Sequence, residues 1–357
     1  MRKGKDALLC LYKIDLMKTF RTLLAFLFIV LLVQGQNTSP VEQSAAVRPP
    51  RPMFDSQHPG VHDPVMIKEG ETFHLFCTGR GITHLTSKDM KTWSMQKPVI
   101  QQTPNWVKDY LPDFKNSYWA PDILFYQGRY HLFYSCSAFG KNTSMIGHAS
   151  STTLDTTAVW TDEGMVVKSV PGKTNWNAID PNIIVDEKGK PWMDFGSFWG
   201  GIQLVQLKKD LSGLEEPVAF KTICSRPRDN SLADTEPGNG AVEAPFIFRH
   251  GNYYYLFPSY DFCCRGLKSD YNVVVGRSKK VTGPYLDMEG KSLETGGGTV
   301  VLKGDDQFAA AGHCGVYTFD NTDYLIAHGY SKAENGASKL IVRVIEWDAQ
   351  GWPILTK

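Results

Sequence analysis

The sequence has almost no net charge, because 38 lysine and arginine residues balance 37 aspartate and glutamate residues in a chain of 357. No run of like charges is present either, so we expect no nucleic acid and no anionic membrane surface among its partners. Cysteine is scarce, with 7 residues, which excludes a small fold framed by disulfides. Several cysteines lie in strand-like runs, where cysteine acts as a small hydrophobe, so the sequence yields no prediction of which cysteines pair. These absences favour a globular protein with a neutral partner.

Long hydrophobic runs are absent except near the N-terminus, where residues 23–33 are all apolar. Lys18 and Arg21 precede this run and Gly35 follows it, which is the pattern of a secretion signal. Eleven residues are too few to cross a bilayer as a helix. We therefore predict export, to the periplasm or the extracellular space. The expected parts are a signal peptide at 1–35 (with Met17 as an alternative start), a flexible leader at 36–53 and a folded domain at 54–357.

One pattern occurs five times along the expected domain. An apolar strand is followed by a turn with Gly, Asp or Asn and then by an aromatic-rich strand that ends in small residues. The first copy, "DPVMIKEGETFHLFCTG", begins at Asp63, and later copies begin after intervals of 57, 60, 64 and 69 residues. The five hairpins cover residues 63–79, 120–135, 180–197, 244–259 and 313–328. Further strand-like runs lie between them, at residues 144–151, 201–207 and 271–278.

This repeat predicts an all-β protein, a five-bladed β-propeller. β-branched and aromatic residues dominate between frequent turn signals, and no long amphipathic helix is evident. A repeat of about 60 residues provides enough strands for one four-stranded sheet, which is the blade of a propeller. A sandwich or a β-helix explains five similar hairpins less well.

The start of each hairpin is expected to place polar side chains at one mouth of the central channel. In a propeller the first strands of the blades line the axis and run in the same direction, so their equivalent ends surround one opening. The residues at these points are Asp63, Ala120, Asp180, Ala244 and His313, with Glu243 one residue earlier in the fourth copy. We therefore expect three carboxylates and a histidine to converge on a solvated axial pocket. Such a pocket explains why Asp180 directly precedes a buried strand.

Two carboxyl groups across a pocket are the machinery of glycoside hydrolysis, in which one protonates the leaving oxygen and the other attacks or activates water. Glu243 is the predicted acid, because its neighbours Ala, Val and Pro form an apolar setting that raises a carboxyl pKa. Asp63 and Asp180 each precede a proline and could singly be turn openers. The same acids with His313 could also hold a hydrolytic metal, but H-E-x-x-H and Asp-rich calcium-loop motifs are missing. A serine triad is disfavoured by the missing G-x-S-x-G.

Longer motifs make the chain similar to a known family. The motifs are "YWAPDI" (118–123), "SAFGKNTSMIG" (137–147), "NAIDPN" (177–182), "FGSFWGGIQL" (195–204), "VEAPFI" (242–247) and "SYDFCCRG" (259–266), with shorter matches such as "HDP" (62–64) and "GHCG" (312–315). On these motifs, and over residues 62–353, the chain resembles the endo-α-1,5-L-arabinanases of glycoside hydrolase family 43. The resemblance implies a five-bladed β-propeller that cleaves internal bonds of arabinan with inversion of anomeric configuration.

The resemblance also implies roles for individual residues. Asp63 is expected to be the general base that activates water, Glu243 the general acid, and Asp180 the group that modulates the pKa of the acid and orients it. His313 matches a histidine that holds a hydrated metal ion, often calcium, near the axis. Residues expected to line the substrate cleft are Trp119, Phe139, Asn182 and Ser197. The expected partners are arabinan and arabino-oligosaccharides, bound by a monomer without a membrane span.

Two positions depart from the arabinanase pattern. Cys314 stands where asparagine is common, and "AHGYS" (327–331) replaces a run similar to "YHAYD", so either could alter the metal site or the cleft near the fifth blade. An exo-acting α-L-arabinofuranosidase or β-xylosidase of the same family is an alternative, since the shape of the groove decides between them. A carbohydrate-binding propeller without catalysis is a third interpretation, although a lectin has no need of three axial acids.

Overall fold

The computed structural model describes residues 54–229 and 231–356. The predicted signal peptide and leader lie outside these residues. Each of the five predicted hairpins is present, and each belongs to a different antiparallel sheet. The alternation of apolar residues and turns along the chain therefore forms strands where the repeat predicts them.

The first three sheets follow one another along the chain. The first sheet contains β1 (Val65–Glu69), β2 (Thr72–Cys77), β4 (Thr83–Ser87) and β5 (Ser94–Met95). The second contains β3 (Gly79–Arg80), β6 (Ser117–Tyr126), β7 (Arg129–Cys136), β8 (Ser144–Ser151) and β9 (Thr161–Ser169). The third contains β10 (Asn182–Val185), β11 (Pro191–Phe195), β12 (Ile202–Gln206) and β13 (Lys221–Cys224).

The fourth and fifth sheets complete the described domain. The fourth contains β14 (Val242–Glu243), β15 (Ile247–His250), β16 (Tyr253–Leu256), β17 (Ser259–Tyr260), β18 (Asn272–Ser278) and β19 (Thr299–Leu302). The fifth contains β20 (Phe308–Phe319), β21 (Thr322–Ser331), β22 (Ala337–Trp347) and β23 (Pro353–Thr356). The prediction of four strands per blade thus holds for three sheets. The second and fourth have additional short strands.

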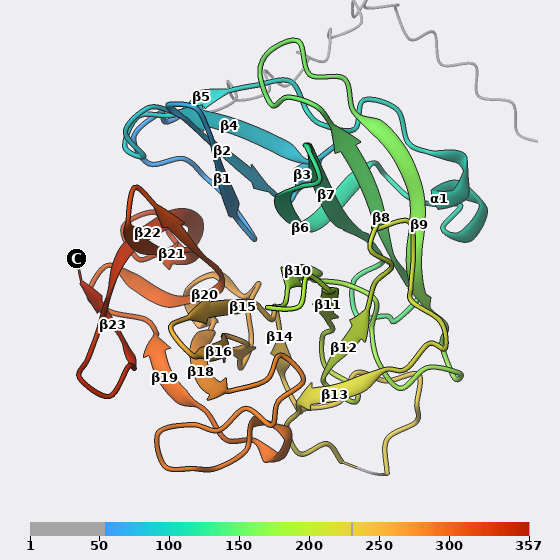
Figure 1. Cartoon of the computed structure of the whole chain (residues 1–357), viewed down its shortest axis with the longest axis vertical. Helices are drawn as coiled ribbons and strands as arrows, with labels where there is room; N and C mark the ends of the chain where they lie inside the picture. Colours follow the sequence, from blue (N-terminus) through green and yellow to red (C-terminus); the bar gives the residue numbers. More distant parts are fainter. Residues whose placement is uncertain (1–53, 230, 357) are drawn as a thin grey trace, which may run out of the picture. The chain divides into compact units, whose positions relative to one another are not determined.

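Figure 1 shows the five sheets around a common centre, with β1, β6, β10, β15 and β20 nearest to it. The domain is therefore a five-bladed β-propeller, as the repeat predicts. Among the described residues the helical segments are short: α1 (Asn105–Tyr110) and the 3-10 turns η1 (Gly266–Lys268) and η2 (Leu293–Thr295). No helix in this part of the chain has the length and hydrophobicity that a membrane span requires.

The hydrophobic core lies between the blades. Five apolar clusters each combine residues of two neighbouring sheets. Strand β7 shows how one strand serves two clusters, because Leu132 belongs to the cluster with the first blade and Phe133 to the cluster with the third. The ring closes by the same packing, since Met66 of β1 and Ile326 of β21 share a cluster. Blades buried on both faces fix the direction of the axial strands, and with it the position of the residues at their ends.

Candidate active site

The five equivalent positions that the repeat identifies share one backbone conformation. Their φ angles are all positive, between 41° and 59°, although none is a glycine. The residues are Asp63, Ala120, Asp180, Ala244 and His313. In the second and fifth blades this residue lies inside a strand, at a β-bulge, and does not precede the strand as predicted. The left-handed residue therefore bends each blade in the same way at the axis.

In four of the five blades a side chain of the preceding blade binds the backbone N–H of this residue. The donors and acceptors are Ala120 N to Thr78 Oγ1 (2.8 Å), Asp180 N to Ser135 Oγ (2.9 Å), His313 N to Ser259 Oγ (2.8 Å) and Asp63 N to His328 Nδ1 (3.1 Å). Each acceptor lies at or next to the last residue of a predicted hairpin. These bonds join consecutive blades at the axis, and the bond to His328 closes the ring.

The junction between the third and fourth blades departs from this pattern. Ala244 N donates to Oδ2 of Asp180 at 3.1 Å. Ser197, which holds the position of the capping hydroxyl, donates to Oε2 of Glu243 at 2.9 Å. The departure therefore ties Asp180 to the residue that follows Glu243 and leaves a hydroxyl group free to orient the Glu243 carboxyl.

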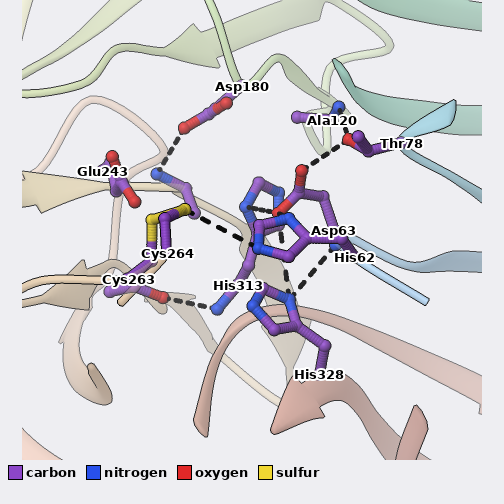
Figure 2. A network of polar contacts seen from close by, with 12 residues as sticks. His62, Asp63, Thr78, Ala120, Asp180, Glu243, Cys263, Cys264, His313 and His328 are labelled. Atoms are coloured by element: carbon purple, nitrogen blue, oxygen red, sulfur yellow. Dashed lines mark hydrogen bonds and ion pairs between the residues drawn. A yellow bond between two sulfur atoms is a disulfide. The ribbon is translucent and has the colours of Figure 1, made fainter. Parts of the chain in front are cut away.

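Asp63 is surrounded by hydrogen-bond donors, as Figure 2 shows. Thr78 donates to Oδ2 at 2.5 Å, whereas Nδ1 of His62 and Nδ1 of His313 lie 2.7 and 2.9 Å from Oδ1. Burial alone would raise the pKa of Asp63, but the charges of His313 and His62 outweigh it and hold the pKa well below its usual value. Asp63 is therefore ionised and able to accept a proton from water.

Asp180 and Glu243 have the opposite electrostatic character. Burial raises the pKa of Asp180 to about 8, and the charges of Glu243 and Asp63 add to the rise against the effect of His313. Burial also raises the pKa of Glu243, and the hydrogen bond from Ser197 opposes this rise. Because the charge of Glu243 acts on Asp180, the two carboxyl groups titrate as a coupled pair, and Asp180 keeps a proton near neutral pH. The site thus combines an ionised carboxylate with a pair that can provide a proton.

One cavity of about 590 Å³ contains these groups and brings Asp63, Asp180, Glu243 and His313 together as predicted. Its lining also includes aromatic side chains, namely Trp119, Phe139, Phe198, Trp199 and Phe262. Phe139 is 80% exposed, so its ring is available to a ligand. Flat apolar surfaces next to a few convergent polar groups suit a sugar chain. The predicted cleft residues Trp119, Phe139 and Ser197 all lie in this lining.

Asn182 has a different environment from the one predicted. It is buried, and its amide donates to Oδ2 of Asp122 at 3.1 Å while its Oδ1 accepts from Ile247 N at 2.8 Å. These contacts join the axial strands β6, β10 and β15 of three blades, and Asn182 is not part of the cavity lining. The left-handed Asp180 interrupts the alternation of the strand, so Asp180 and Asn182 do not share surroundings although they are two residues apart.

His313 lies among the three acids, in the same cavity lining. Burial alone would lower its pKa, but the carboxylate of Asp63, followed by those of Asp180 and Glu243, raises it to about 9. Near neutral pH the imidazole of His313 is therefore itself a cation among these acids, and a metal ion bound to it would displace a proton. Among the described residues, His62, Asp63 and His328 also bring possible ligand atoms within 4.8 Å of one another. Their contacts with one another already explain this group, since both histidines bind Asp63.

The two departures from the arabinanase pattern have different surroundings. Cys314 is 3% exposed in the apolar cluster between the fourth and fifth blades, and it does not belong to the cavity lining. Residues 327–331 do reach the site, because His328 accepts the N–H of Asp63 and the hydroxyl of Tyr330 lies 3.1 Å from Nε2 of His62.

Sequence reasoning missed three side chains that hold Asp63, namely His62, Thr78 and His328. Their available signal was position, since His62 directly precedes Asp63 and the other two stand at the ends of predicted hairpins. The contact between His328 and Asp63 joins residues 265 apart in the chain. Motif spacing cannot reveal such a contact without the propeller ring.

An ionised base, two carboxyl groups of raised pKa and aromatic surfaces in one axial cavity are the site chemistry of a glycoside hydrolase. Comparison with known protein families agrees with this assignment. Residues 57–353 match the model of Glycosyl hydrolases family 43, and the chain belongs to this family.

Individual relatives are similar over most of the chain. An extracellular exo-α-(1→5)-L-arabinofuranosidase of Cellvibrio japonicus is 47% identical over 82% of this chain and 85% of its own length. An extracellular endo-α-(1→5)-L-arabinanase of Bacillus subtilis is 42% identical over 82% of this chain and 87% of its own. The solved α-L-arabinanase of Cellvibrio cellulosa, in complex with arabinohexaose, has 45% identity and a TM-score of 0.82 over 84% of this chain and 96% of that chain.

Proposed function

We propose that this protein hydrolyses internal α-1,5-L-arabinofuranosidic bonds of arabinan with inversion of anomeric configuration. The observation that carries the proposal is the division of charge among the axial acids: Asp63 is ionised, whereas the pKa values of Asp180 and Glu243 are raised. The names of the Cellvibrio and Bacillus relatives support arabinan as the substrate. The same names and the composition of residues 1–35 support export of the protein.

The reaction would be a single displacement. Asp63 takes a proton from water, whose oxygen bonds to the anomeric carbon while the bond from this carbon to the leaving oxygen breaks. Glu243 gives its proton to the leaving oxygen, and Asp180 keeps that proton available by pairing with Glu243. Thr78 and His62 fix the Asp63 carboxylate through the hydrogen bonds described above, and Ser197 fixes Glu243.

We also propose a hydrated metal ion, with calcium expected, beside His313. The residues that would hold it are His313 and, through water, the neighbouring acids. When bound, the ion would add positive charge beside the acids and so stabilise the ionised form of the base Asp63. His313 itself contributes a fixed position, because its backbone N–H is bound by Ser259 and its Nδ1 by Asp63.

The endo pattern and an exo pattern differ in whether the sugar chain extends past the catalytic axis on both sides. The exposed ring of Phe139 in the cavity lining supports an open cleft and a long chain. The 47% identity to the exo-acting enzyme of Cellvibrio japonicus favours the second candidate, an exo-acting arabinofuranosidase. In both cases we expect the protein to act as a monomer.

The first experiment is to incubate the full-length protein, produced with export, with linear arabinan and with nitrophenyl arabinofuranoside. A ladder of oligosaccharides from arabinan, with little release from the small substrate, is the expected result. Arabinose as the sole early product would favour the exo pattern. Nuclear magnetic resonance of the first product checks inversion, because it distinguishes the two anomers before they equilibrate.

The Glu243→Gln variant tests the catalytic assignment. Loss of general acid catalysis should reduce turnover by about 10²- to 10⁴-fold while oligosaccharide binding remains. Glu346→Gln is the matched control, since Glu346 is exposed on β22 and should not affect turnover. Unchanged turnover in Glu243→Gln would refute the assignment, and absence of hydrolysis by the wild-type protein would favour a binding propeller.

A further inference from the structure

Two adjacent cysteines, Cys263 and Cys264, form a disulfide in the loop between β17 and η1. Both residues line the cavity that contains the catalytic acids. Figure 2 shows the disulfide beside His62, and Sγ of Cys264 lies 3.7 Å from Nε2 of that histidine. The other described cysteines are free thiols buried in the blades. The disulfide therefore lies on the cavity wall, at the edge of the core, whereas the other described cysteines lie inside the blades.

The backbone around the disulfide is fixed by hydrogen bonds. The N–H of Phe262 donates to Asp270 Oδ1 at 2.8 Å, and the N–H of Cys264 donates to the hydroxyl of Tyr330 at 2.7 Å. Cys263 also packs against the apolar cluster that includes Tyr330. The two sulfur atoms consequently occupy a defined place on the wall of the cavity.

A disulfide between neighbours changes what these residues offer to a ligand. In an extended chain successive side chains point to opposite sides, whereas the bond keeps both sulfur atoms of Cys263 and Cys264 on one side. It also removes two S–H groups and leaves polarizable sulfur, which packs well against apolar groups. Because Cys264 is exposed and Cys263 partly exposed, this surface is open to the cavity.

The apolar surface continues from the disulfide along the cavity wall. Phe262 directly precedes Cys263, and its ring centre lies 5.8 Å from that of Phe198, which also lines the cavity. The guanidinium of Arg265 lies 3.8 Å from the centre of the Phe262 ring, so charged donors stand next to this surface. An apolar face with polar groups at its margin is suited to a sugar ring, which combines a C–H face with hydroxyl groups.

We propose that the Cys263–Cys264 disulfide is a sugar-binding surface of the cleft, against which one ring of the arabinan chain packs beside the base Asp63. The identity of the sugar rests on the proposed function. The contact of Cys264 with His62, whose Nδ1 lies 2.7 Å from Asp63, places this ring next to the site of water attack. Reduction of the disulfide separates the two sulfur atoms and removes the surface without removing any catalytic group.

Binding without turnover gives the most direct test. The dissociation constant of linear arabinohexaose is measured by calorimetry on full-length Glu243→Gln protein, before and after treatment with a phosphine reductant. Alkylation of residues 263 and 264, located by mass spectrometry, verifies reduction. We expect binding to weaken about tenfold on reduction. The same protein with Cys263→Ser and Cys264→Ser should bind as weakly as the reduced form and should not respond to the reductant, because it lacks the disulfide.

Turnover by the otherwise wild-type protein separates a binding surface from a general structural effect. Reduction should raise KM for arabinohexaose several-fold with little change in kcat, and the temperature of unfolding should stay the same. An unchanged dissociation constant in verified reduced protein that still hydrolyses arabinan would overturn the disulfide proposal alone. A loss of kcat at constant KM would also overturn it, because it would show that the disulfide acts by positioning His62 and not by binding sugar. Failure of the oxidised wild-type protein to hydrolyse any arabinan would overturn the proposed function, and the assignment of the sugar with it.

Discussion

Replacement of Ser197 by alanine should raise the pKa of the catalytic acid. The hydroxyl of Ser197 donates to Oε2 of Glu243 at 2.9 Å, which stabilises the ionised carboxylate and lowers its pKa against the effect of burial. A hydrogen bond to a charged group contributes about 1.5–3 kcal/mol, and one pKa unit corresponds to about 1.4 kcal/mol. The pKa of Glu243 should therefore rise by about one to two units in Ser197→Ala.

The pH dependence of kcat/KM on linear arabinan measures this change, because it reports the ionisation of the free enzyme. Its alkaline limb corresponds to loss of the proton that Glu243 and Asp180 share, and this limb should move upward by about one unit or more. The acidic limb, which corresponds to protonation of Asp63, should stay in place, since Ser197 has no described contact with Asp63. The rate at the optimum should fall, because a weaker and less constrained acid protonates the leaving oxygen more slowly.

Ser259→Ala is the matched control. Ser259 stands at the equivalent place in the fourth blade, but its hydroxyl accepts the backbone N–H of His313 at 2.8 Å. The alkaline limb of this variant should coincide with that of the wild type. An alkaline limb that is unchanged or lowered in Ser197→Ala would refute the role of Ser197 in setting the pKa of Glu243.

Acid should destabilise the fold through two buried histidines, His84 and His148. Burial lowers their pKa values from 6.5 to about 3. As the pH falls from 6.5 toward 3, only the unfolded chain therefore takes up these two protons, which favours unfolding. His84→Gln removes one such group, so between pH 7.5 and pH 5 it should gain about 2 kcal/mol of unfolding free energy relative to the wild type. Urea unfolding measures the difference, and a difference independent of pH would contradict the neutral state of His84. Removal of metal by a chelator should lower turnover without unfolding the protein, and calcium should restore it. Full activity in protein that is metal-free by elemental analysis would exclude the ion beside His313.

The sequence contains enough information to predict the five blades and the three acids. The signal is the regular recurrence of a hairpin, which places Asp63, Asp180 and His313 at equivalent points before any coordinate is known. The two additional strands of the fourth blade, β14 and β17, escape such reasoning, and so does the position of β19. Strands β14 and β17 have two residues each, too few for a periodic pattern, and β19 pairs with β18 across a bulge.

The finer architecture of the site depends on contacts between distant blades. Left-handed conformation at an alanine such as Ala120 has no residue signature, because glycine is the residue that normally marks it. The disulfide also escaped prediction, since adjacent cysteines in a chain with scattered others do not indicate a bond between neighbours. Only its exposure distinguishes Cys264 from the free cysteines, which are buried, and exposure is a property of the fold.

The one irregular junction of the axial ring explains how two similar carboxyl groups can be separated experimentally. Because Oδ2 of Asp180 replaces the hydroxyl that caps Ala244 N, Asp180→Asn keeps a hydrogen-bond acceptor there while it removes one charge from the pair. In this variant Glu243 titrates alone. Its pKa should lie below the higher of the two apparent pKa values of the coupled pair, so the alkaline limb of kcat/KM should move to lower pH. This shift is opposite in sign to that of Ser197→Ala. Shifts of the same sign in the two variants would show that the proton is not shared between Asp180 and Glu243, and that Asp180 acts only by holding the backbone of the fourth blade.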